Sequence, residues 1–257
     1  MRRSTTLLRQ LLLALGAAAT VVFTAQQVRP AFFSKTTVAQ RVLAVPRVTG
    51  DSGVFRLPWL HAPADLAMRT PEFERDRLAF TRDLLATGNL TATRATRIAD
   101  AAVRQAYRDR IPPALVLGVM LVENDEFKPT ARSKVGAVGL MQIMPRIWRP
   151  ALGKKFGTNL KDDTVNVRYG VFILRVFHDE TARALTPREG YRKALLAYNG
   201  CVTGKNTRGC HRYPDVVKRR VVQGARNSCA GRTFDQCVVE PLWLRKRVER
   251  LALRSAD

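Results

Sequence analysis

The stretch from Pro113 to Glu123 constrains the fold of this chain more than any other. Nine consecutive residues, 114–122, carry no charge, and Glu123 follows them directly. A helix that is apolar on every side must be surrounded by other elements, because none of its faces can be left in water. The sequence therefore predicts a multi-helix domain with this helix inside it.

Helical periodicity recurs on both sides of this stretch. Apolar residues at helical spacing, a capping residue at Thr91 and helix-opening prolines at Pro113 and Pro187 mark these elements. The expected helices cover residues 72–86, 91–107, 114–123, a segment from Asp162-Asp163 to Phe177, 187–198, 215–222 and 242–253. Residues 139–144 are too short to assign alone, and Pro145 is expected to end them. The predicted fold class is mainly α.

The N-terminus has the pattern of an export signal. Arg2, Arg3 and Arg9 precede fifteen uncharged residues that end at Ala25. An uncleaved anchor over residues 7–25 is favoured over a cleaved signal, because the position two before Ala25 is not small; the alternative is a buried core helix. The expected organisation is a signal peptide or signal anchor (1–25), a spacer rich in Pro and Gly (26–70), a globular domain (71–240) and a basic C-terminal helix (241–257).

The four cysteines, Cys201, Cys210, Cys229 and Cys237, all lie in the last quarter of the chain. An even number in an exported protein favours disulfides, and three pairings exist. Cys201 with Cys210 and Cys229 with Cys237 would each close a short loop. The competing interpretation is a zinc site that includes His211, but no Cys-x-x-Cys spacing occurs, so no metal is expected.

The charge of the chain indicates an anionic partner. Lys and Arg number 44 against 21 Asp and Glu, which gives a formal net charge of +23. Nucleic acid, anionic lipid and acidic wall polymers all fit this excess. The basic residues are spread through the expected helices and no nucleic-acid-reading motif is present. With an export signal, contact with the membrane surface or a wall polymer is expected, and nucleic-acid binding is not.

Glu123 is the first candidate for chemistry. Burial among apolar residues and the negative end of the helix dipole both raise the pKa of a carboxyl group. A carboxyl that stays protonated near neutral pH can give a proton to a leaving-group oxygen, which makes cleavage of a glycosidic bond the first hypothesis. The alternative is an ordinary solvated helix end, because Asn124, Asp125 and Glu126 follow.

Two further segments offer polar groups. Glycines within residues 136–142 permit close approach of the backbone to a ligand, and Gln142 carries both a donor and an acceptor. Tyr198 and Asn199 end another apolar helix and offer a hydroxyl and an amide. Taken alone, each segment is equally consistent with an ordinary loop or helix end, with Met141 filling a gap in the core.

In this order, these segments resemble the catalytic domain of the soluble-type lytic transglycosylases, which has a goose-type-lysozyme-like fold. The resemblance runs from near Ile98 to Val217, about 120 residues. The residues that carry it are Ile111 to Val116, Glu123, Phe127, Pro129, Ala131, Ser133, Gly136 to Pro145, Asn166, Gly170, Leu174, Ala197 to Gly200 and Tyr213 to Val217.

The resemblance implies a lysozyme-like domain over residues 71–240 that acts on peptidoglycan glycan strands without metal or cofactor. Glu123 would be the single acid and then the base, cleaving the β-1,4 bond between N-acetylmuramic acid and N-acetylglucosamine to leave a 1,6-anhydro end. Tyr198 would orient Glu123 or the substrate, and Tyr213 would be a further hydrogen-bond donor near the acid. The implied substrate-binding residues are Asn124, Ser133, Met141, Gln142, Tyr198, Asn199 and Tyr213.

The sequence departs from the family pattern at three places. Asn124 stands where the family usually has Ser, Phe127 and Pro129 lie one residue further from the acid, and Cys201 replaces a small residue. A Cys201–Cys210 bridge would stiffen the loop that follows. Two alternatives stay open at this point, a muramidase that uses water and a wall-binding module without activity. The expected location is the periplasm or cell envelope.

Overall fold

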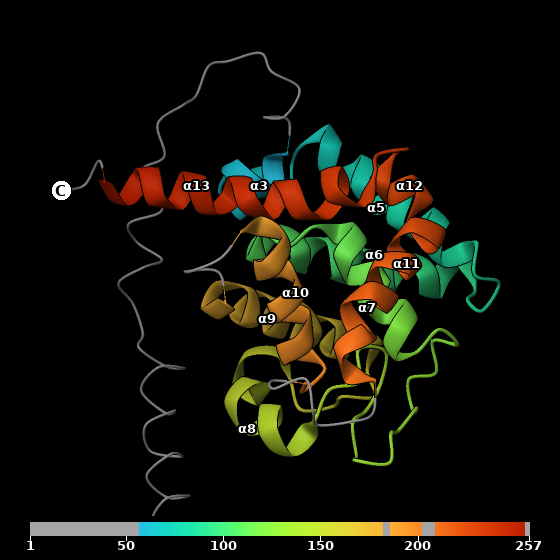
Figure 1. The fold of residues 1–257 in the computed structure, drawn as a ribbon. Helices are drawn as coiled ribbons and strands as arrows, with labels where there is room; N and C mark the ends of the chain where they lie inside the picture. Colours follow the sequence, from blue (N-terminus) through green and yellow to red (C-terminus); the bar gives the residue numbers. More distant parts are fainter. Residues whose placement is uncertain (1–56, 182–185, 202–208, 255–257) are drawn as a thin grey trace, which may run out of the picture. The chain divides into compact units, whose positions relative to one another are not determined.

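The computed structural model describes residues 57–181, 186–201 and 209–254. The predicted signal or anchor and most of the predicted spacer lie outside these residues. The helices are α3 (Pro58–His61), α4 (Ala64–Ala67), α5 (Pro71–Leu85), α6 (Ala92–Asp109), α7 (Pro113–Glu123), α8 (Pro145–Phe156), α9 (Asp163–Thr181), α10 (Pro187–Tyr198), η2 (Cys210–Arg212), α11 (Tyr213–Gly224), α12 (Arg226–Cys229), the π-helical turn η3 (Asp235–Val239) and α13 (Glu240–Arg254) (Figure 1). Outside the helices these residues contain only isolated β-bridges, so the mainly α prediction is confirmed. No helix in them is long and apolar enough to cross a membrane.

Helix α7 forms the centre of the core, as its composition predicts. Every residue from Pro113 to Leu121 is buried. The helix packs chiefly on α11, and it also contacts α5, α6, α12 and η3 (Figure 1). A Cβ atom at Gly118 would lie 2.3 Å from Cγ2 of Val221, so a glycine is needed at the α7–α11 contact. This close packing fixes the end of α7, where Glu123 lies.

Helices α5 and α6 pair beside α7, and both begin where the sequence predicts. The side chain of Thr70 caps α5 and that of Thr91 caps α6, each accepting a backbone N–H three residues on. Phe73 and Tyr107 meet edge to face across the pair, with ring centroids 5.1 Å apart. The Tyr107 hydroxyl donates to Asp76 at 2.8 Å. Helix α9 then packs between α6 and α10.

The structure differs from the sequence-based prediction at two elements. Pro145 does not end a short segment but opens α8, because proline is well tolerated in the first turn, where its missing N–H has no helical partner. The last residues of the predicted spacer also join the core: Trp59 and Leu60 of α3 and Ala67 of α4 are buried. Short helices between prolines show too little periodicity to be found in the sequence.

The C-terminal helix α13 is basic, as predicted, and it carries a buried arginine. Arg245 is 4% exposed. Its guanidinium donates to a carboxylate oxygen of Asp179, to the carbonyl oxygen of Asp109 at 3.1 Å and to Glu249 at 3.2 Å. The helix is thereby bonded to α6 and α9, so it is part of the folded body.

Of the three possible pairings, the structure has the one that closes two short loops. Cys201 bonds to Cys210, nine residues on, and Cys229 bonds to Cys237, eight residues on. All four sulfurs are used in these bonds. A zinc site built on the same cysteines with His211 would need free thiolates, so that interpretation is wrong.

Candidate functional site

Glu123 is the last residue of α7, at the point where the apolar helix reaches the surface. Its side chain is partly buried, and burial raises the pKa of the carboxyl group to about 7. A hydrogen bond from Tyr213 opposes this effect by favouring the ionised form, but burial is the larger cause. The carboxyl group is therefore half protonated near neutral pH and can act as a proton donor there.

Tyr213 holds one oxygen of this carboxyl. Its hydroxyl, at the first residue of α11, donates a hydrogen bond to Oε1 of Glu123. Burial, followed by the nearby charge of Glu123, raises the pKa of Tyr213 well above its ordinary value. The phenol therefore stays neutral and keeps its proton to donate. Oε1 accepts this bond, and no hydrogen bond from the described residues reaches Oε2.

Tyr198 lies near Glu123 but is bonded elsewhere. Burial and then the charge of Glu123 raise the pKa of the Tyr198 phenol, which indicates that the two side chains are close. Its hydroxyl donates to the carbonyl oxygen of Met141 at 2.8 Å. Tyr198 thus joins the end of α10 to the glycine-containing loop. Its predicted contact with the substrate stays a prediction.

Asn124 closes the turn that follows the acid. It is buried, its Nδ2 donates to the carbonyl oxygens of Lys128 at 2.7 Å and Gly139 at 3.3 Å, and its Oδ1 accepts from the Lys128 N–H at 3.1 Å. All of these partners are backbone groups. The amide therefore attaches the end of α7 to the glycine loop, and this contact gives the residue a positioning role that the sequence did not predict.

Asn166 organises the same loop from α9, a role that was not predicted from the sequence. It is 1% exposed, and its Oδ1 accepts from the Met141 N–H at 2.8 Å. Its Nδ2 donates at 2.8 Å to the carbonyl oxygens of Val138 and Leu160. A Cβ atom at Gly139, where φ is +83°, would lie 2.2 Å from that Nδ2. A polar residue between two valines of an apolar helix is the sequence signal that could have revealed this role.

The other predicted binding residues, Gln142, Ser133, Met141 and Asn199, differ in their burial and in their hydrogen bonds. Gln142 has a φ of +46°, and its Nε2 donates to the Gly139 carbonyl at 2.9 Å. Ser133 Oγ accepts from the Ala137 N–H at 3.0 Å and so closes a turn. The Met141 side chain is fully buried and lies against Gly170 of α9. Asn199 is exposed at the end of α10.

The carboxylates that follow Glu123 have a different environment. Asp125 is exposed and pairs with Arg220 at 2.9 Å, and Glu126 is exposed and pairs with Lys128 at 2.5 Å. Both side chains are exposed and paired with a cation, whereas Glu123 is largely removed from water, so the structure favours Glu123 among these three acids as a proton donor. The described residues contain no group of three or more His, Cys, Asp or Glu side chains that could hold a metal ion.

A cavity of about 450 Å³ lies on another side of the same helix end. Its lining includes Leu121, Asp125 and Arg220, with Asn227 of α12. Glu123 is not among its lining residues. The acid and this cavity are therefore separate features of the surface around the end of α7.

Comparison with known proteins identifies a domain in the middle of the chain. Residues 100–209 match the family model of the Transglycosylase SLT domain. This match confirms the resemblance that the sequence motifs indicated. Tyr213, which is bonded to Glu123, lies beyond the matched residues.

Named relatives match the same part of the chain. The "Membrane-bound lytic murein transglycosylase C" of Actinobacillus pleuropneumoniae serotype 5b (strain L20) is 33% identical over 104 residues, which cover 37% of this chain and 28% of that protein. The protein of the same name from Glaesserella parasuis serovar 5 (strain SH0165) is 33% identical over 119 residues, 43% of this chain and 32% of the relative. The "Transglycosylase" of Enterobacteria phage PRD1 is 40% identical over 91 residues, 35% of this chain and 29% of the relative. The chain thus spans less than a third of each relative, and no solved structure matches it.

Proposed function

We propose that this chain, which carries a Transglycosylase SLT domain over residues 100–209, is a lytic transglycosylase with a lysozyme-like fold that cleaves peptidoglycan glycan strands. Glu123 is the acid and then the base. The observation that carries this proposal is the environment of Glu123, where burial raises the pKa to about 7 while Tyr213 holds one carboxyl oxygen. The names of the relatives support the choice of substrate.

The first step is protonation of the leaving group. Glu123 donates the proton on Oε2 to the oxygen that bridges N-acetylmuramic acid and N-acetylglucosamine. The bond from this oxygen to the anomeric carbon of the muramic acid breaks, and N-acetylglucosamine leaves with a new 4-hydroxyl. The acetamido group of the muramic acid stabilises the positive charge at the anomeric carbon.

The second step restores the acid. The Glu123 carboxylate takes the proton of the 6-hydroxyl of the same muramic acid, and that oxygen bonds to the anomeric carbon. The product is a 1,6-anhydro end, no water is consumed, and Glu123 is protonated again. Asp125 and Glu126 are solvated and ion-paired, so neither supports a two-carboxylate mechanism.

The decisive experiment replaces the acid. In Glu123→Gln we expect turnover of purified murein to fall by at least about 100-fold, the scale of general acid–base catalysis. The variant should keep the wild-type circular dichroism spectrum, because Gln can still accept the Tyr213 hydrogen bond. Asp125→Asn, next to the acid but solvated, is the matched control and should stay close to wild type. Wild-type turnover by Glu123→Gln would remove Glu123 from the mechanism.

The products separate the transglycosylase from its alternatives. Mass spectrometry of released muropeptides should show anhydro ends, whereas a hydrolytic muramidase would leave reducing ends. An inactive wall-binding module would give no clearing in a murein zymogram.

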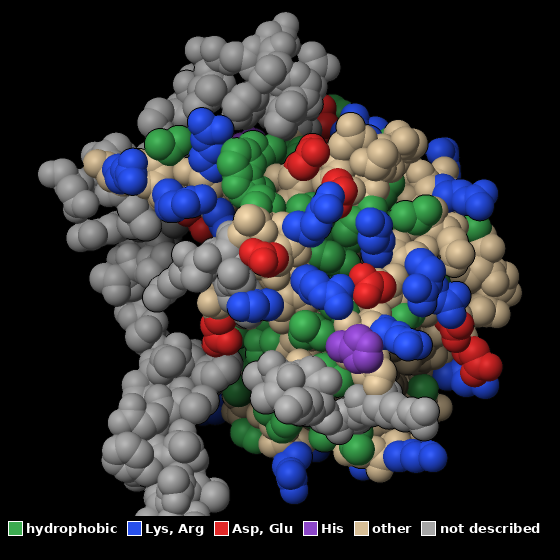
Figure 2. Space-filling model, in the orientation of Figure 1, with side chains coloured by type: hydrophobic (Ala, Val, Ile, Leu, Met, Phe, Trp, Pro, Cys, Tyr) green, Lys and Arg blue, Asp and Glu red, His purple; other side chains and the backbone are tan. Residues whose placement is uncertain are grey.

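The proposed place of action is the cell envelope. The export pattern of residues 1–25, the two disulfides and the relatives named as membrane-bound proteins all support it. Lys and Arg side chains are widely distributed over the face drawn in Figure 2, with fewer Asp and Glu among them. We include contact of this basic surface with anionic membrane lipid or wall polymer in the proposal.

A further inference from the structure

The Cys201–Cys210 disulfide lies between the two tyrosines near Glu123. Cys201 follows Tyr198 by three residues, and Cys210 precedes Tyr213 by three. Both cysteines are buried, at 0% and 6% exposure. The bond therefore joins the end of α10 to the beginning of α11 on the side of the fold where the acid lies.

The position of Tyr213 depends on the turn that contains Cys210. Only η2 separates this cysteine from the first residue of α11, and the Arg212 N–H donates to the Gly209 carbonyl at 3.0 Å within that turn. The Tyr213 hydroxyl reaches Glu123 from the opening residue of the helix. A shift of this turn thus moves the hydroxyl directly.

Other contacts keep α10 and α11 together without the disulfide. The Tyr191 hydroxyl donates to the Pro214 carbonyl at 2.9 Å, and Arg192 pairs with the exposed Asp215 at 3.0 Å. An exposed ion pair contributes little, and the two hydrogen bonds that remain, from Tyr191 to the Pro214 carbonyl and from Arg192 to the His211 carbonyl at 2.9 Å, are not covalent restraints. The helices are expected to stay docked when the disulfide is removed, but the first turn of α11 loses its covalent constraint.

We propose that the Cys201–Cys210 disulfide is a positioning element of the site, which holds the Tyr213 hydroxyl on Oε1 of Glu123 and so keeps the acid proton on Oε2. Its effect on cleavage rests on the proposed function. Its effect on the protonation of Glu123 does not, because it follows from the described contacts alone.

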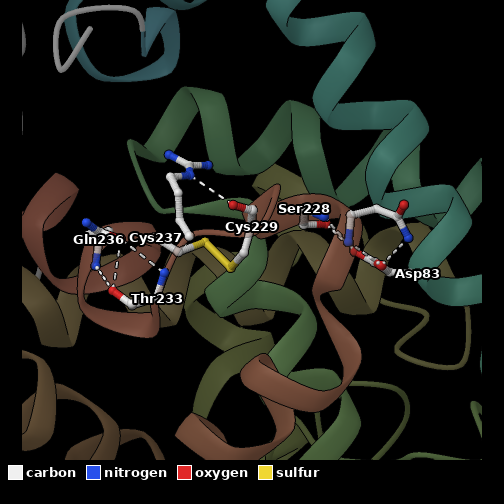
Figure 3. The surroundings of a disulfide bond; sticks show 8 residues. Asp83, Ser228, Cys229, Thr233, Gln236 and Cys237 are labelled. Carbon is white, nitrogen blue, oxygen red and sulfur yellow. Dashed lines mark hydrogen bonds between the residues drawn. A yellow bond between two sulfur atoms is a disulfide. The ribbon is translucent and has the colours of Figure 1, made fainter.

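The second disulfide supplies a matched control. Cys229–Cys237 closes a loop of similar length, and Figure 3 shows it between the Asp83–Ser228 and Thr233–Gln236 hydrogen bonds. No hydrogen bond described for these residues leads to Glu123 or Tyr213. Its loss should lower stability in the same way as loss of the first bond, without moving the acid.

The test is a double-mutant cycle in the full chain. It compares the Cys201→Ala/Cys210→Ala pair, Tyr213→Phe and the two combined, with Cys229→Ala/Cys237→Ala as control; Ala avoids adding a buried hydroxyl. Loss of a donor to a carboxylate favours the neutral acid, so the alkaline limb of the pH–rate profile should move upward by about one pH unit in both Tyr213→Phe and the first cysteine pair. With Phe at position 213, removal of the disulfide should add nothing further to the shift. We also expect about a tenfold fall in kcat for the first cysteine pair.

Three results would overturn the inference: an unmoved alkaline limb in the Cys201→Ala/Cys210→Ala pair, an equal shift in the control pair, or a shift that adds to that of Tyr213→Phe. Should the first pair not fold, reduction and reoxidation of the remaining bond in Cys229→Ala/Cys237→Ala gives the same comparison. If the wild-type chain does not cleave murein, the proposed function fails, yet the inference is still tested. Carbon NMR of labelled Glu then reports the pKa of Glu123 across the same cycle.

Discussion

At the scale of single residues, the site depends on two opposing effects on one carboxyl group. Burial disfavours the anion of Glu123, and the Tyr213 hydroxyl stabilises it. Burial is the larger effect, and it places the pKa at about 7. Additional hydrogen-bond donors to the Glu123 carboxyl group would lower its pKa further. The group would then be ionised at neutral pH and could not protonate a leaving group.

The pH dependence of cleavage follows from this balance. The proton on Glu123 is needed for the first step, so kcat/KM should fall as the pH rises through about 7. The pH–rate profile of purified enzyme on murein measures this alkaline limb. A limb that persists unchanged in Tyr213→Phe would show that another group titrates.

Stability should depend on pH through the same residue. The folded-state pKa of Glu123, about 7, lies above its ordinary value of 4.5. The stability that depends on the neutral form is therefore fully present below about pH 4.5 and is lost as the pH rises through 7. Glu123→Gln should be more stable than wild type at pH 8, by roughly 2–3 kcal/mol, and nearly equal at pH 4. Urea unfolding at the two pH values measures the difference.

The sequence predicted the acid better than its supporting residues. Glu123 could be found because it follows nine uncharged residues and stands at the position of the acid in the motif that resembles the soluble-type lytic transglycosylases. The positioning contacts of Asn124 and Asn166 were not predicted, because the backbone groups that they bond lie in loops whose conformation only the fold defines. The Met141 side chain is buried beside Gly170, and its predicted place in the substrate groove stays a prediction.

At the scale of helices, the contact of α7 with α11 sets the geometry of the site. Gly118 allows the two helices to approach, and the same pair carries Glu123 and Tyr213 at its ends. Gly118→Ala should destabilise the fold by about 1–3 kcal/mol, because its methyl group would overlap Val221. Adding Val221→Ala should restore part of this loss, which thermal unfolding of the single and double variants measures. Additive losses would show that the two positions are not in contact.

Helices with strong caps and regular periodicity were predictable from sequence, and others were not. Thr91 and Pro113 marked real helix starts. Helix α8 was not predicted, because Pro145 was expected to end the preceding segment. A proline at that point can equally be the first residue of a helix. The local sequence does not distinguish the two, because proline is tolerated in the first turn of a helix and also ends one.

At the scale of the whole molecule, the net charge of +23 predicts electrostatic binding. Association with anionic phospholipid vesicles or with isolated wall polymer should weaken strongly between about 50 and 500 mM salt, since exposed charges are screened over a Debye length. Co-sedimentation across this salt series measures it. Binding that does not change with salt would point to apolar insertion instead.

The buried guanidinium of α13 determines where the domain can be shortened. The recognisable stretch stops at residue 209, but the buried Arg245 of α13 bonds to Asp109 and Asp179, and Tyr213 donates a hydrogen bond to Glu123. A recombinant fragment trimmed to the homologous segment would lose the bonds of Arg245 to α6 and α9, and Glu123 would lose its hydrogen-bond donor. The end of the family match is therefore not the end of the folded domain. Activity assays need a protein that extends through residue 254.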